Sequence, residues 1–382
     1  MKKRILFIPS TVSGGVYYYR CYTPMMLLSE KLKDEFEIEI NNTFKFTDQE
    51  KDEIGKNYSI VWVHNGLYMT DIQDEFWKMI IYCKKNYGTK FILDLDDYWE
   101  YHKLHPAYNA CMFNAFPDKM MINFKLFDYI TTTTEYFKNV ISEHFPESKI
   151  FVFPNAISLR DSQFSLKDKT KSPKLRLGIT GGSSHTEDIK QLLEFPKYLT
   201  SKQLEQIELV FCGFDTSGER VGIDENGKVI SKTKIDPKDN WWFKTENKFK
   251  TMLGDNYRRV ETKDIMKGEF GKIYNDIDVI LVPLDNNKFN RCKSELKFIE
   301  AGFTNTAIIC SNVIPYNNFG VNGEDCLMPK EPNPKEWARV IKRLLREPEL
   351  LERITLYNRI KVIGFRNLEN ITKDRIEFLR SI

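Results

Sequence analysis

Two lysines and a glutamate in the predicted helix over residues 293–303 have a spacing suited to a nucleotide. Lys293, Lys297 and Glu300 stand at i, i+4 and i+7, so they share one helical face. Lysine charges at a helix start add to the partial positive charge of its amide end, which suits a diphosphate, and Ser294 lies beside them. Glu300, one turn further on, can accept hydrogen bonds from both hydroxyls of a ribose. The alternative is a solvated Lys–Glu face.

Two glycine pairs could bring backbone amides close to an anion. Gly14-Gly15 and Gly181-Gly182 each follow the first predicted strand of one half of the chain. Such turns can cradle a phosphate at a helix start, although a tight strand-to-helix turn is the plain alternative. The first pair lacks both the G-x-G-x-x-G and the G-x-x-x-x-G-K-[ST] spacing, which argues against a dinucleotide site and a P-loop.

The second glycine pair leads into a predicted helix start. Ser183 follows directly, and residues 184–187 read Ser-His-Thr-Glu, a capping box. A strand, two glycines and a capped helix form a phosphate cradle, and His185 in the first turn would bond a phosphate or a sugar. A surface histidine is an equally weighted alternative.

Three aspartates end the predicted strand over residues 90–94 or follow it. Asp94, Asp96 and Asp97 repel one another, so a cation, basic neighbours or raised pKa values must compensate them. Helix capping by Asp96 or Asp97 is one alternative role, and hydrogen bonding that shapes an adjacent cleft is another.

Alternating strands and helices would position these residues. With a prior of about 150 residues per domain, 382 residues favour two domains. The β-rich runs alternate with helix-period segments, which is typical of parallel sheets covered by helices, where ligands bind beyond the carboxyl ends of the strands. The predicted strands are 4–8, 37–40, 59–63, 90–94, 129–132 and 150–153 in the first half, and 175–179, 208–211, 258–260, 279–282 and 307–310 in the second.

The domain boundaries follow from the composition along the chain. Residues 1–160 form the first predicted domain and residues 172–345 the second, with a polar, lysine-rich insertion at 215–250. The insertion has a predicted hairpin turn at 224–227 and reads as a surface lid. Residues 346–382 contain no predicted strand, so these helices either cap the second domain or cross back to the first.

The overall composition excludes several classes of protein. Lys and Arg total 57 against 54 for Asp and Glu, so the net charge of +3 excludes a polyanion-coating protein. The longest apolar runs are far shorter than the roughly 20 residues that span a bilayer. The seven cysteines are scattered without C-x-x-C spacing, which favours reduced thiols. We expect a soluble cytoplasmic protein, peripheral at the membrane at most, or one of the host cytoplasm if a phage encodes it.

Four segments of the second half resemble the donor half of GT-B glycosyltransferases. They are residues 278–284, 293–302, 307–316 and 322–327, and the closest similarity is to glycosyltransferase family 4 of the bacterial and phage type. The resemblance implies two facing Rossmann-like doubly wound domains with a cleft between them. By position, Glu300 matches the glutamate that binds the nucleotide ribose. Cys292 stands where the family has its first glutamate, which leaves open whether Glu295 substitutes.

The resemblance implies a glycosyltransferase that moves a sugar from a nucleotide-sugar to a hydroxyl acceptor with retention of configuration. We expect a UDP- or GDP-sugar as co-substrate and no metal or other cofactor. The acceptor is a glycan or a lipid-linked sugar, and inversion would need Asp96 or Asp97 as a general base. The predicted donor ligands are Gly14, Gly15, Gly181, Gly182, Ser183, His185, Lys293, Ser294, Lys297 and Glu300, and the predicted acceptor-side residues are Arg20, His64, Asn65, Trp241 and Trp242.

Three alternatives stay open. A phage-type DNA glycosyltransferase acting on hydroxymethylated bases would use the lysines of the insertion on a phosphate backbone, with Trp241 and Trp242 stacking or wedging a base. Replacement of the first glutamate by Cys292 would suit an inactive nucleotide-sugar-binding module. The Asp94-Leu-Asp96 pattern resembles the metal site of the other large glycosyltransferase fold, although the rest of the chain does not fit that single-domain fold.

Overall fold

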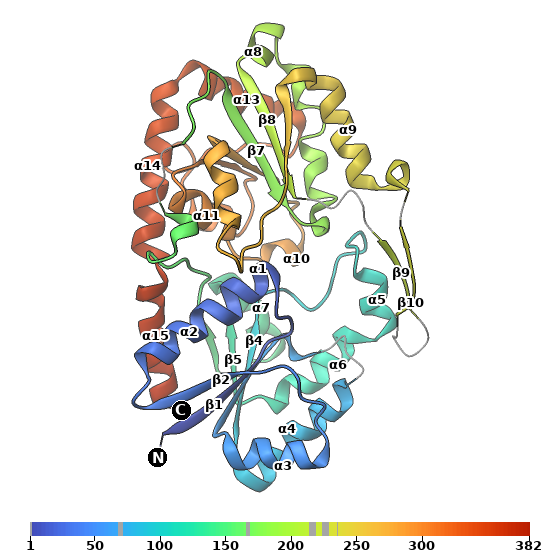
Figure 1. Ribbon diagram of the computed structural model, residues 1–382, viewed down its shortest axis with the longest axis vertical. Coiled ribbons are helices and arrows are strands. Elements are labelled where there is room, and N and C mark those ends of the chain that lie inside the picture. Colours follow the sequence, from blue (N-terminus) through green and yellow to red (C-terminus); the bar gives the residue numbers. More distant parts are fainter. Residues whose placement is uncertain (1, 68–71, 166–168, 214–218, 224–228, 235) are drawn as a thin grey trace.

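The structure, a computed structural model, describes all residues except 1, 68–71, 166–168, 214–218, 224–228 and 235. It has two domains stacked along the long axis of the molecule, each built on a parallel sheet with helices on both faces (Figure 1). The predicted two-domain α/β architecture is therefore confirmed. None of the helices in the described ranges is long and apolar enough to cross a membrane.

The first domain has a six-stranded sheet in the order β2-β1-β3-β4-β5-β6. Successive residues of its strands face opposite sides: Ile5 and Trp62 pack on one face, and Leu6 and Val61 on the other. Burial on both faces explains the near-continuous apolar runs in the sequence. The strands are β1 (Lys3–Ile8), β2 (Phe36–Ile40), β3 (Ile60–His64), β4 (Lys90–Leu95), β5 (Tyr129–Thr132) and β6 (Ile150–Val152), and the longer helices are α2 (Thr23–Lys31), α3 (Asp48–Asn57), α4 (Gln73–Tyr87), α5 (Tyr108–Phe113), α6 (Phe116–Asn123) and α7 (Glu135–His144).

The helix after β1 changes its pitch near the domain interface. It begins with α1 (Gly14–Val16), continues as a π-helical segment (Tyr17–Tyr22) and ends as α2. Gly14 has φ = +75°, a conformation that side chains with a Cβ rarely adopt, so this tight start requires glycine. A π-helical turn shifts the direction of the side chains that follow it. Here Tyr19 is directed to Glu300 of the second domain, and Arg20 to Asp94 inside the first.

The second domain has a five-stranded parallel sheet in the order β11-β8-β7-β12-β13. Numbered along the chain, this is the order 3-2-1-4-5 of a Rossmann-like sheet, in which the order reverses between β7 and β12. The strands are β7 (Leu175–Gly181), β8 (Ile207–Gly213), β11 (Tyr257–Val260), β12 (Val279–Val282) and β13 (Ala307–Cys310), and the helices are α8 (Ser201–Glu205), α9 (Trp241–Leu253), α10 (Lys288–Arg291), α11 (Leu296–Phe303), α12 (Tyr316–Phe319) and α13 (Pro334–Arg346).

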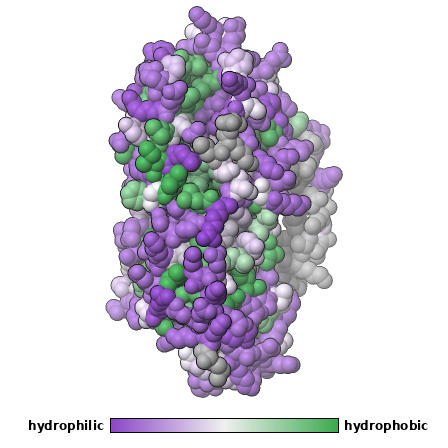
Figure 2. Space-filling view, turned by 60° about the vertical axis from the view of Figure 1, so that its left-hand side comes forward, coloured by the Kyte–Doolittle hydropathy of each residue, from purple (hydrophilic) through white to green (hydrophobic). Residues whose placement is uncertain are grey.

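The last two helices connect the domains. α14 (Pro348–Phe365) packs along α11 of the second domain, and α15 (Leu368–Ser381) packs on α2 of the first, as the red helices at the left of Figure 1 show. Phe378 of α15 enters the first-domain core beside Trp62 and Phe153. The face that carries these helices is mostly hydrophilic, with scattered apolar areas (Figure 2). The C-terminal helices thus hold the two domains together.

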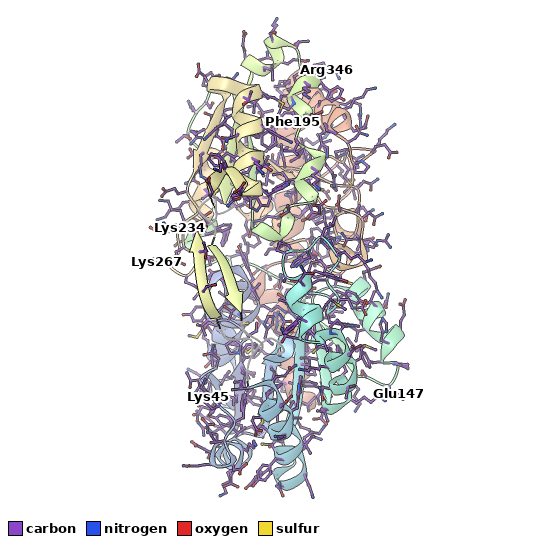
Figure 3. The ribbon with its side chains drawn as sticks, turned by 90° about the vertical axis from the view of Figure 1, so that its right-hand side faces the viewer. Lys45, Glu147, Phe195, Lys234, Lys267 and Arg346 are labelled. Atoms are coloured by element: carbon purple, nitrogen blue, oxygen red, sulfur yellow. The ribbon has the colours of Figure 1, made fainter. Side chains whose placement is uncertain are left out.

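The insertion contains a β-hairpin and a helix. β9 (Glu219–Ile223) and β10 (Val229–Lys234) pair in antiparallel register, and the predicted turn at 224–227 lies outside the described residues. Figures 1 and 3 show the hairpin at one side of the molecule, extending from the second domain toward the first, with Lys234 at its upper end. The helix of the insertion, α9, instead packs on the second domain.

Two helix starts differ from the prediction. The helix predicted over 293–303 begins at Leu296, so Lys293 and Ser294 lie in the connection between α10 and α11. The segment after Gly182 forms short 3₁₀ turns, one at Ser183–His185 and another at Asp188–Gln191, in place of a capped α-helix. Both segments bend at the interface, where contacts with other elements outweigh local propensity.

Candidate donor site between the domains

A cavity of about 420 Å³ lies between the two domains and opens into a second pocket of about 350 Å³. The second-domain wall includes the loops after β7 and β12, which is the point where the strand order reverses and where such sheets bind ligands. Gly15, Gly182, His185 and Lys297 border both spaces, Lys293 and Ser294 border the larger one, and Gly14, Gly181 and Glu300 border the smaller one. The structure thus brings together every predicted donor ligand except Ser183, whose side chain is not described.

Asp94 is paired with Arg20 inside the first domain. The guanidinium donates from Nε to Oδ2 of Asp94 at 2.8 Å and from Nη2 to Oδ1 at 2.6 Å, and it also donates to the carbonyl of Phe153. Arg20 is 4% exposed and Asp94 2%. Arg20 borders the cavity, and three of its five N–H donors are used by Asp94 and Phe153. Burial and pairing make Arg20 a support of the cavity wall, and its predicted contact to an acceptor or phosphate stays a prediction.

Asp96 is held by the last residue of β3 and by the residue that follows it. Asn65 Nδ2 donates to Asp96 Oδ1 at 3.0 Å, and His64 Nε2 lies 3.2 Å from the same oxygen. His64 is fully buried, and its Nδ1 is bonded to Ser10 Oγ at 2.8 Å. Burial would lower the pKa of His64, but the Asp96 carboxylate raises it well above its usual value, and the His64 charge holds the pKa of Asp96 low despite burial. His64 is thus a buried partner of Asp96 and does not lie on the acceptor surface. The prediction that His64 contacts the acceptor is corrected accordingly.

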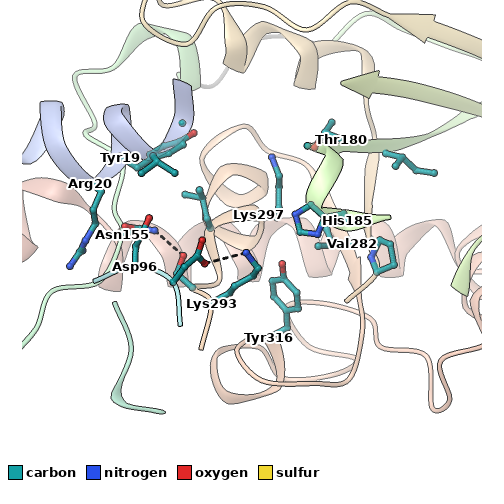
Figure 4. Close-up of a pocket in the computed structure, with 18 of the residues that line it drawn as sticks. Tyr19, Arg20, Asp96, Asn155, Thr180, His185, Val282, Lys293, Lys297 and Tyr316 are labelled. Atoms are coloured by element: carbon teal, nitrogen blue, oxygen red, sulfur yellow. Dashed lines mark hydrogen bonds and ion pairs between the residues drawn. The ribbon is translucent and has the colours of Figure 1, made fainter. Parts of the chain in front are cut away.

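Asp97 reaches across the interface. Its Oδ1 accepts from Lys293 Nζ at 3.2 Å, shown as a dashed line in Figure 4. The three neighbouring aspartates therefore diverge to three different basic partners: Arg20 for Asp94, His64 for Asp96 and Lys293 for Asp97. Basic neighbours supply the compensation that the carboxylates require. This arrangement does not fit a shared metal ion, because each carboxylate is directed to its own cation.

Glu300 is the centre of a second interdomain network. Its Oε1 accepts from Tyr19 OH of the first domain at 2.8 Å, and its Oε2 accepts from Tyr274 OH at 2.5 Å and Lys297 Nζ at 2.7 Å. Burial and the Glu300 carboxylate raise the pKa of both phenols well above the usual value, so they stay protonated donors. A carboxylate offers about four acceptor positions. With three occupied, Glu300 has room for one ribose hydroxyl, and not for both as the sequence predicts.

His185 is oriented by a buried carboxylate. Its Nδ1 lies 2.7 Å from Asp188 Oδ2, and Asp188 is 3% exposed. The other oxygen of Asp188 accepts from the Asp285 amide at 2.7 Å and from Asn290 Nδ2 at 2.9 Å, which fixes the carboxylate. Nδ1 is thereby the ring nitrogen bonded to Asp188, so Nε2 is the one available to the cavity that His185 borders (Figure 4).

Neither Cys292 nor Glu295 reaches the cavity. Cys292 is fully buried, and burial raises the pKa of its thiol to about 12. Glu295 is 3% exposed and accepts from Arg366 Nε at 2.5 Å, so its carboxylate ties α14 to the segment before α11. The possibility that Glu295 substitutes for the missing glutamate is therefore contradicted.

The two tryptophans of the insertion do not face the cleft. Trp242 is 4% exposed and belongs to the core of the second domain with Phe249, and Trp241 packs against the same core. Asn240 caps α9 by accepting from the Trp242 amide at 2.9 Å. The acceptor-side prediction is wrong for Trp242, because its apolar ring is used to attach α9. Trp241 is half-buried and borders a different pocket of the second domain, beside Lys244 and Lys248, and not the cavity between the domains.

Several cavity residues were missed in the sequence. Asn155, 7% exposed, lies shortly after β6, with Phe153 and Pro154 between them, and its Nδ2 donates to Ser294 Oγ across the interface at 2.8 Å. Tyr19 immediately precedes Arg20, and Tyr316 borders the far wall. The signal for Asn155 was its position after a strand end. Tyr19 had no local signal, since only the π-helical turn directs it to Glu300.

His105 gives the interface a pH-dependent contact. It stacks on Tyr101 with ring centroids 4.3 Å apart, and burial, followed by the charges of Lys293 and His102, lowers its pKa from 6.5 to about 4. Between these values the unfolded chain binds a proton that the folded protein does not, so the free energy of unfolding decreases as the pH falls from about 6.5 to 4. In His105→Gln, the difference between the free energies of unfolding at pH 7 and pH 5 should shrink, as measured by urea-induced unfolding. An unchanged difference would contradict this assignment.

No protein-family model matches the sequence, and no curated protein matches it. Solved structures, in contrast, match the fold of this protein. Sucrose-phosphate synthase from Thermosynechococcus elongatus aligns with a TM-score of 0.70 and 14% identity over 100% of this chain and 99% of that one. HepE (Alr3699) from Anabaena, in complex with UDP and glucose, aligns with a TM-score of 0.67 and 8% identity over 100% of both chains.

A third match is partial. The pneumococcal O-GlcNAc transferase GtfA, in complex with UDP and GlcNAc, aligns with a TM-score of 0.54 and 15% identity over 84% of this chain and 56% of that one. The two full-length matches have the same arrangement of two domains as this protein. The chain therefore has the fold of the GT-B glycosyltransferases, two facing Rossmann-like domains with a cleft between them.

Proposed function

We propose that the protein is a family 4-type glycosyltransferase that transfers a sugar from a UDP- or GDP-sugar to a hydroxyl acceptor. The observation that carries this proposal is the cavity between the domains, where two glycine turns and two lysines surround one space beside Glu300. HepE, which shares the fold, was solved with UDP and glucose. In this protein the diphosphate would lie among Gly182, Lys293 and Lys297.

The lysines can stabilise the leaving diphosphate without a covalent step by the protein. Lys293 and Lys297 each have three N–H donors and use one on a carboxylate, Asp97 and Glu300 respectively. A Cβ at Gly182 would meet nothing within 4 Å, so its backbone is open to the cavity. Fixed positive charge and amides at the place where negative charge develops are an effective form of catalysis.

Metal independence and retention of configuration are part of the proposal. The aspartates are already balanced by basic side chains, which supports a reaction that relies on lysines for the diphosphate. A general base works best with a pKa near the working pH. The charge of His64 holds the pKa of Asp96 low despite burial, so Asp96 is poorly suited to deprotonate an acceptor. This favours retention over inversion.

A lipid-linked acceptor is favoured by one surface of the first domain. α5 and α6 pack together and the segment exposes Leu104, Met112, Phe113 and Ile122 at 64%, 50%, 71% and 73%. Exposed apolar residues with nearby lysines suit the surface of a membrane. The DNA alternative loses one of its two base-stacking residues, because Trp242 lies in the core, and Trp241 does not border the cavity between the domains.

The test is release of UDP or GDP from a panel of UDP- and GDP-sugars, with membrane lipid extract as the source of acceptor. We expect nucleotide release from at least one sugar nucleotide, and the same rate after EDTA treatment. Binding of a sugar nucleotide with no release, with or without acceptor, would instead identify a binding module. Loss of activity in EDTA, restored by a divalent cation, would contradict metal independence alone.

A further inference from the structure

Asn155 has one buried amide atom without a hydrogen bond to any described residue. Its Nδ2 donates to Ser294, but its Oδ1 is buried and has no hydrogen-bond partner among the described residues. Asn155 is 7% exposed and borders the cavity of about 420 Å³ (Figure 4). A buried acceptor without a partner is unfavourable, so a ligand hydroxyl that donates to Oδ1 would gain the bond that the protein leaves unmade.

Asp97 presents a second acceptor to the same cavity. Its Oδ1 is bonded to Lys293, whereas its Oδ2 has no hydrogen bond within the described ranges, and its side chain is 36% exposed. Lys293 follows Cys292 and precedes Ser294, the partner of Asn155, so the two interdomain pairs come from consecutive residues of the second domain. Asn155 Oδ1 and Asp97 Oδ2 are therefore two acceptors on neighbouring parts of one wall.

The nearby carboxylates of the second domain do not offer comparable acceptors. Glu295 is turned to Arg366 and does not border the cavity of about 420 Å³. Glu300, which keeps one acceptor position, borders the smaller pocket instead. The acceptors free to bond a ligand next to Lys293 and Ser294 thus belong to the first domain.

We propose that the transferred sugar lies between the Asn155–Ser294 and Asp97–Lys293 pairs and that Asn155 Oδ1 and Asp97 Oδ2 accept hydrogen bonds from its hydroxyls. This rests on the proposed function. The sugar is then a neutral, hydroxyl-bearing hexose. A uronic acid should bind more weakly, because its carboxylate cannot donate to these oxygens and the adjacent Lys293 is already paired with Asp97.

Recognition by the first domain has a measurable consequence. The nucleotide would bind to the second domain, whereas the sugar would be hydrogen-bonded by side chains of the first. The affinities for the two parts of the donor therefore depend on different residues. Loss of a hydrogen-bond acceptor from the first domain should lower the affinity for a nucleotide-sugar and leave the affinity for the free nucleotide nearly unchanged.

The experiment is calorimetric titration of the full chain with UDP, UDP-glucose and UDP-glucuronate, and with GDP, GDP-mannose and GDP-mannuronate. The wild-type protein should bind the neutral sugar nucleotide at least about tenfold more tightly than the uronate. Asn155→Ala should weaken the neutral sugar nucleotide by about tenfold, the effect of one lost hydrogen bond, and change the free nucleotide by less than about twofold. Asp97→Asn also releases Lys293 from its ion pair, so its readout is the ratio of sugar-nucleotide affinity to free-nucleotide affinity, which should fall by a similar factor. Asp118→Asn, at an exposed position of α6, is the matched control.

Each contrary outcome has a separate meaning. Equal weakening of nucleotide and nucleotide-sugar in Asn155→Ala, or equal binding of uronate and neutral sugar by the wild type, would overturn this inference and leave the proposed function intact. A wild-type protein that binds none of the six compounds would overturn the proposed function as well. If thermal melting shows that Asn155→Ala does not fold, Asn155→Ser takes its place, because serine is smaller yet keeps a polar group.

Discussion

Asp94→Ala should lower the free energy of unfolding by about 3–5 kcal/mol, the usual cost of removing one partner of a buried ion pair. Asp94 receives two bonds from Arg20 and one from the Thr131 hydroxyl. Arg375 of α15, 2% exposed, lies close enough that burial and the Arg20 charge lower its pKa to about 9. Without Asp94, two buried guanidinium groups would lose their shared counter-charge.

Urea-induced unfolding followed by tryptophan fluorescence measures this effect, since Trp62 and Trp99 are buried in the same domain. Arg4→Ala is the matched control. It breaks the pairs of Arg4 with Glu37 and Glu39, whose side chains are 33%, 59% and 36% exposed, and should cost about 1 kcal/mol. If Asp94→Ala lowers the free energy of unfolding by as little as the control does, the structural role assigned to the Arg20–Asp94 pair is contradicted.

The sheets could be predicted from the sequence because buried parallel strands are marked by short apolar runs. Each predicted strand overlaps an observed one, from β1 (Lys3–Ile8) to β13 (Ala307–Cys310). The glycine turns and the lysines near residue 295 could be placed in one site because post-strand loops gather at one edge of a sheet. Local pattern and tertiary structure agree at these positions.

The partners of the site residues could not be predicted, because they come from segments distant in the chain. Its position after a glycine turn predicts that Arg20 binds a ligand. Its partner in the fold is Asp94, 74 residues away, and no local pattern indicates that contact. Glu300 likewise meets Tyr19 across 281 residues. Trp242 follows a lysine-rich segment, yet burial of its apolar ring outweighs the exposure of its neighbours. Sequence spacing indicates which side chains lie in the same site. It does not indicate which of them are already hydrogen-bonded or ion-paired with each other.

Replacing Glu300 should produce the largest loss of donor affinity. In Glu300→Gln, with nearly the same shape, the loss of a charged acceptor should weaken UDP or GDP by about 10- to 100-fold, since bonds to charged groups contribute about 1.5–3 kcal/mol. Unlike Asn155→Ala, this change should affect the free nucleotide and the nucleotide-sugar equally, because the ribose belongs to both. Glu300→Ala should also reduce stability, because Tyr19, Tyr274 and Lys297 would lose their acceptor.

A nucleotide without a ribose hydroxyl separates recognition from structural support. If Glu300 bonds the ribose, the wild-type protein should bind 2′-deoxy-UDP more weakly than UDP, or 2′-deoxy-GDP more weakly than GDP, and Glu300→Gln should reduce that difference. Tyr19→Phe is the matched control, because it removes one donor to Glu300 and leaves the carboxylate in place. It should preserve the discrimination against the deoxynucleotide. An undiminished difference in Glu300→Gln would show that the carboxylate only organises Tyr19, Tyr274 and Lys297, and that another group holds the ribose.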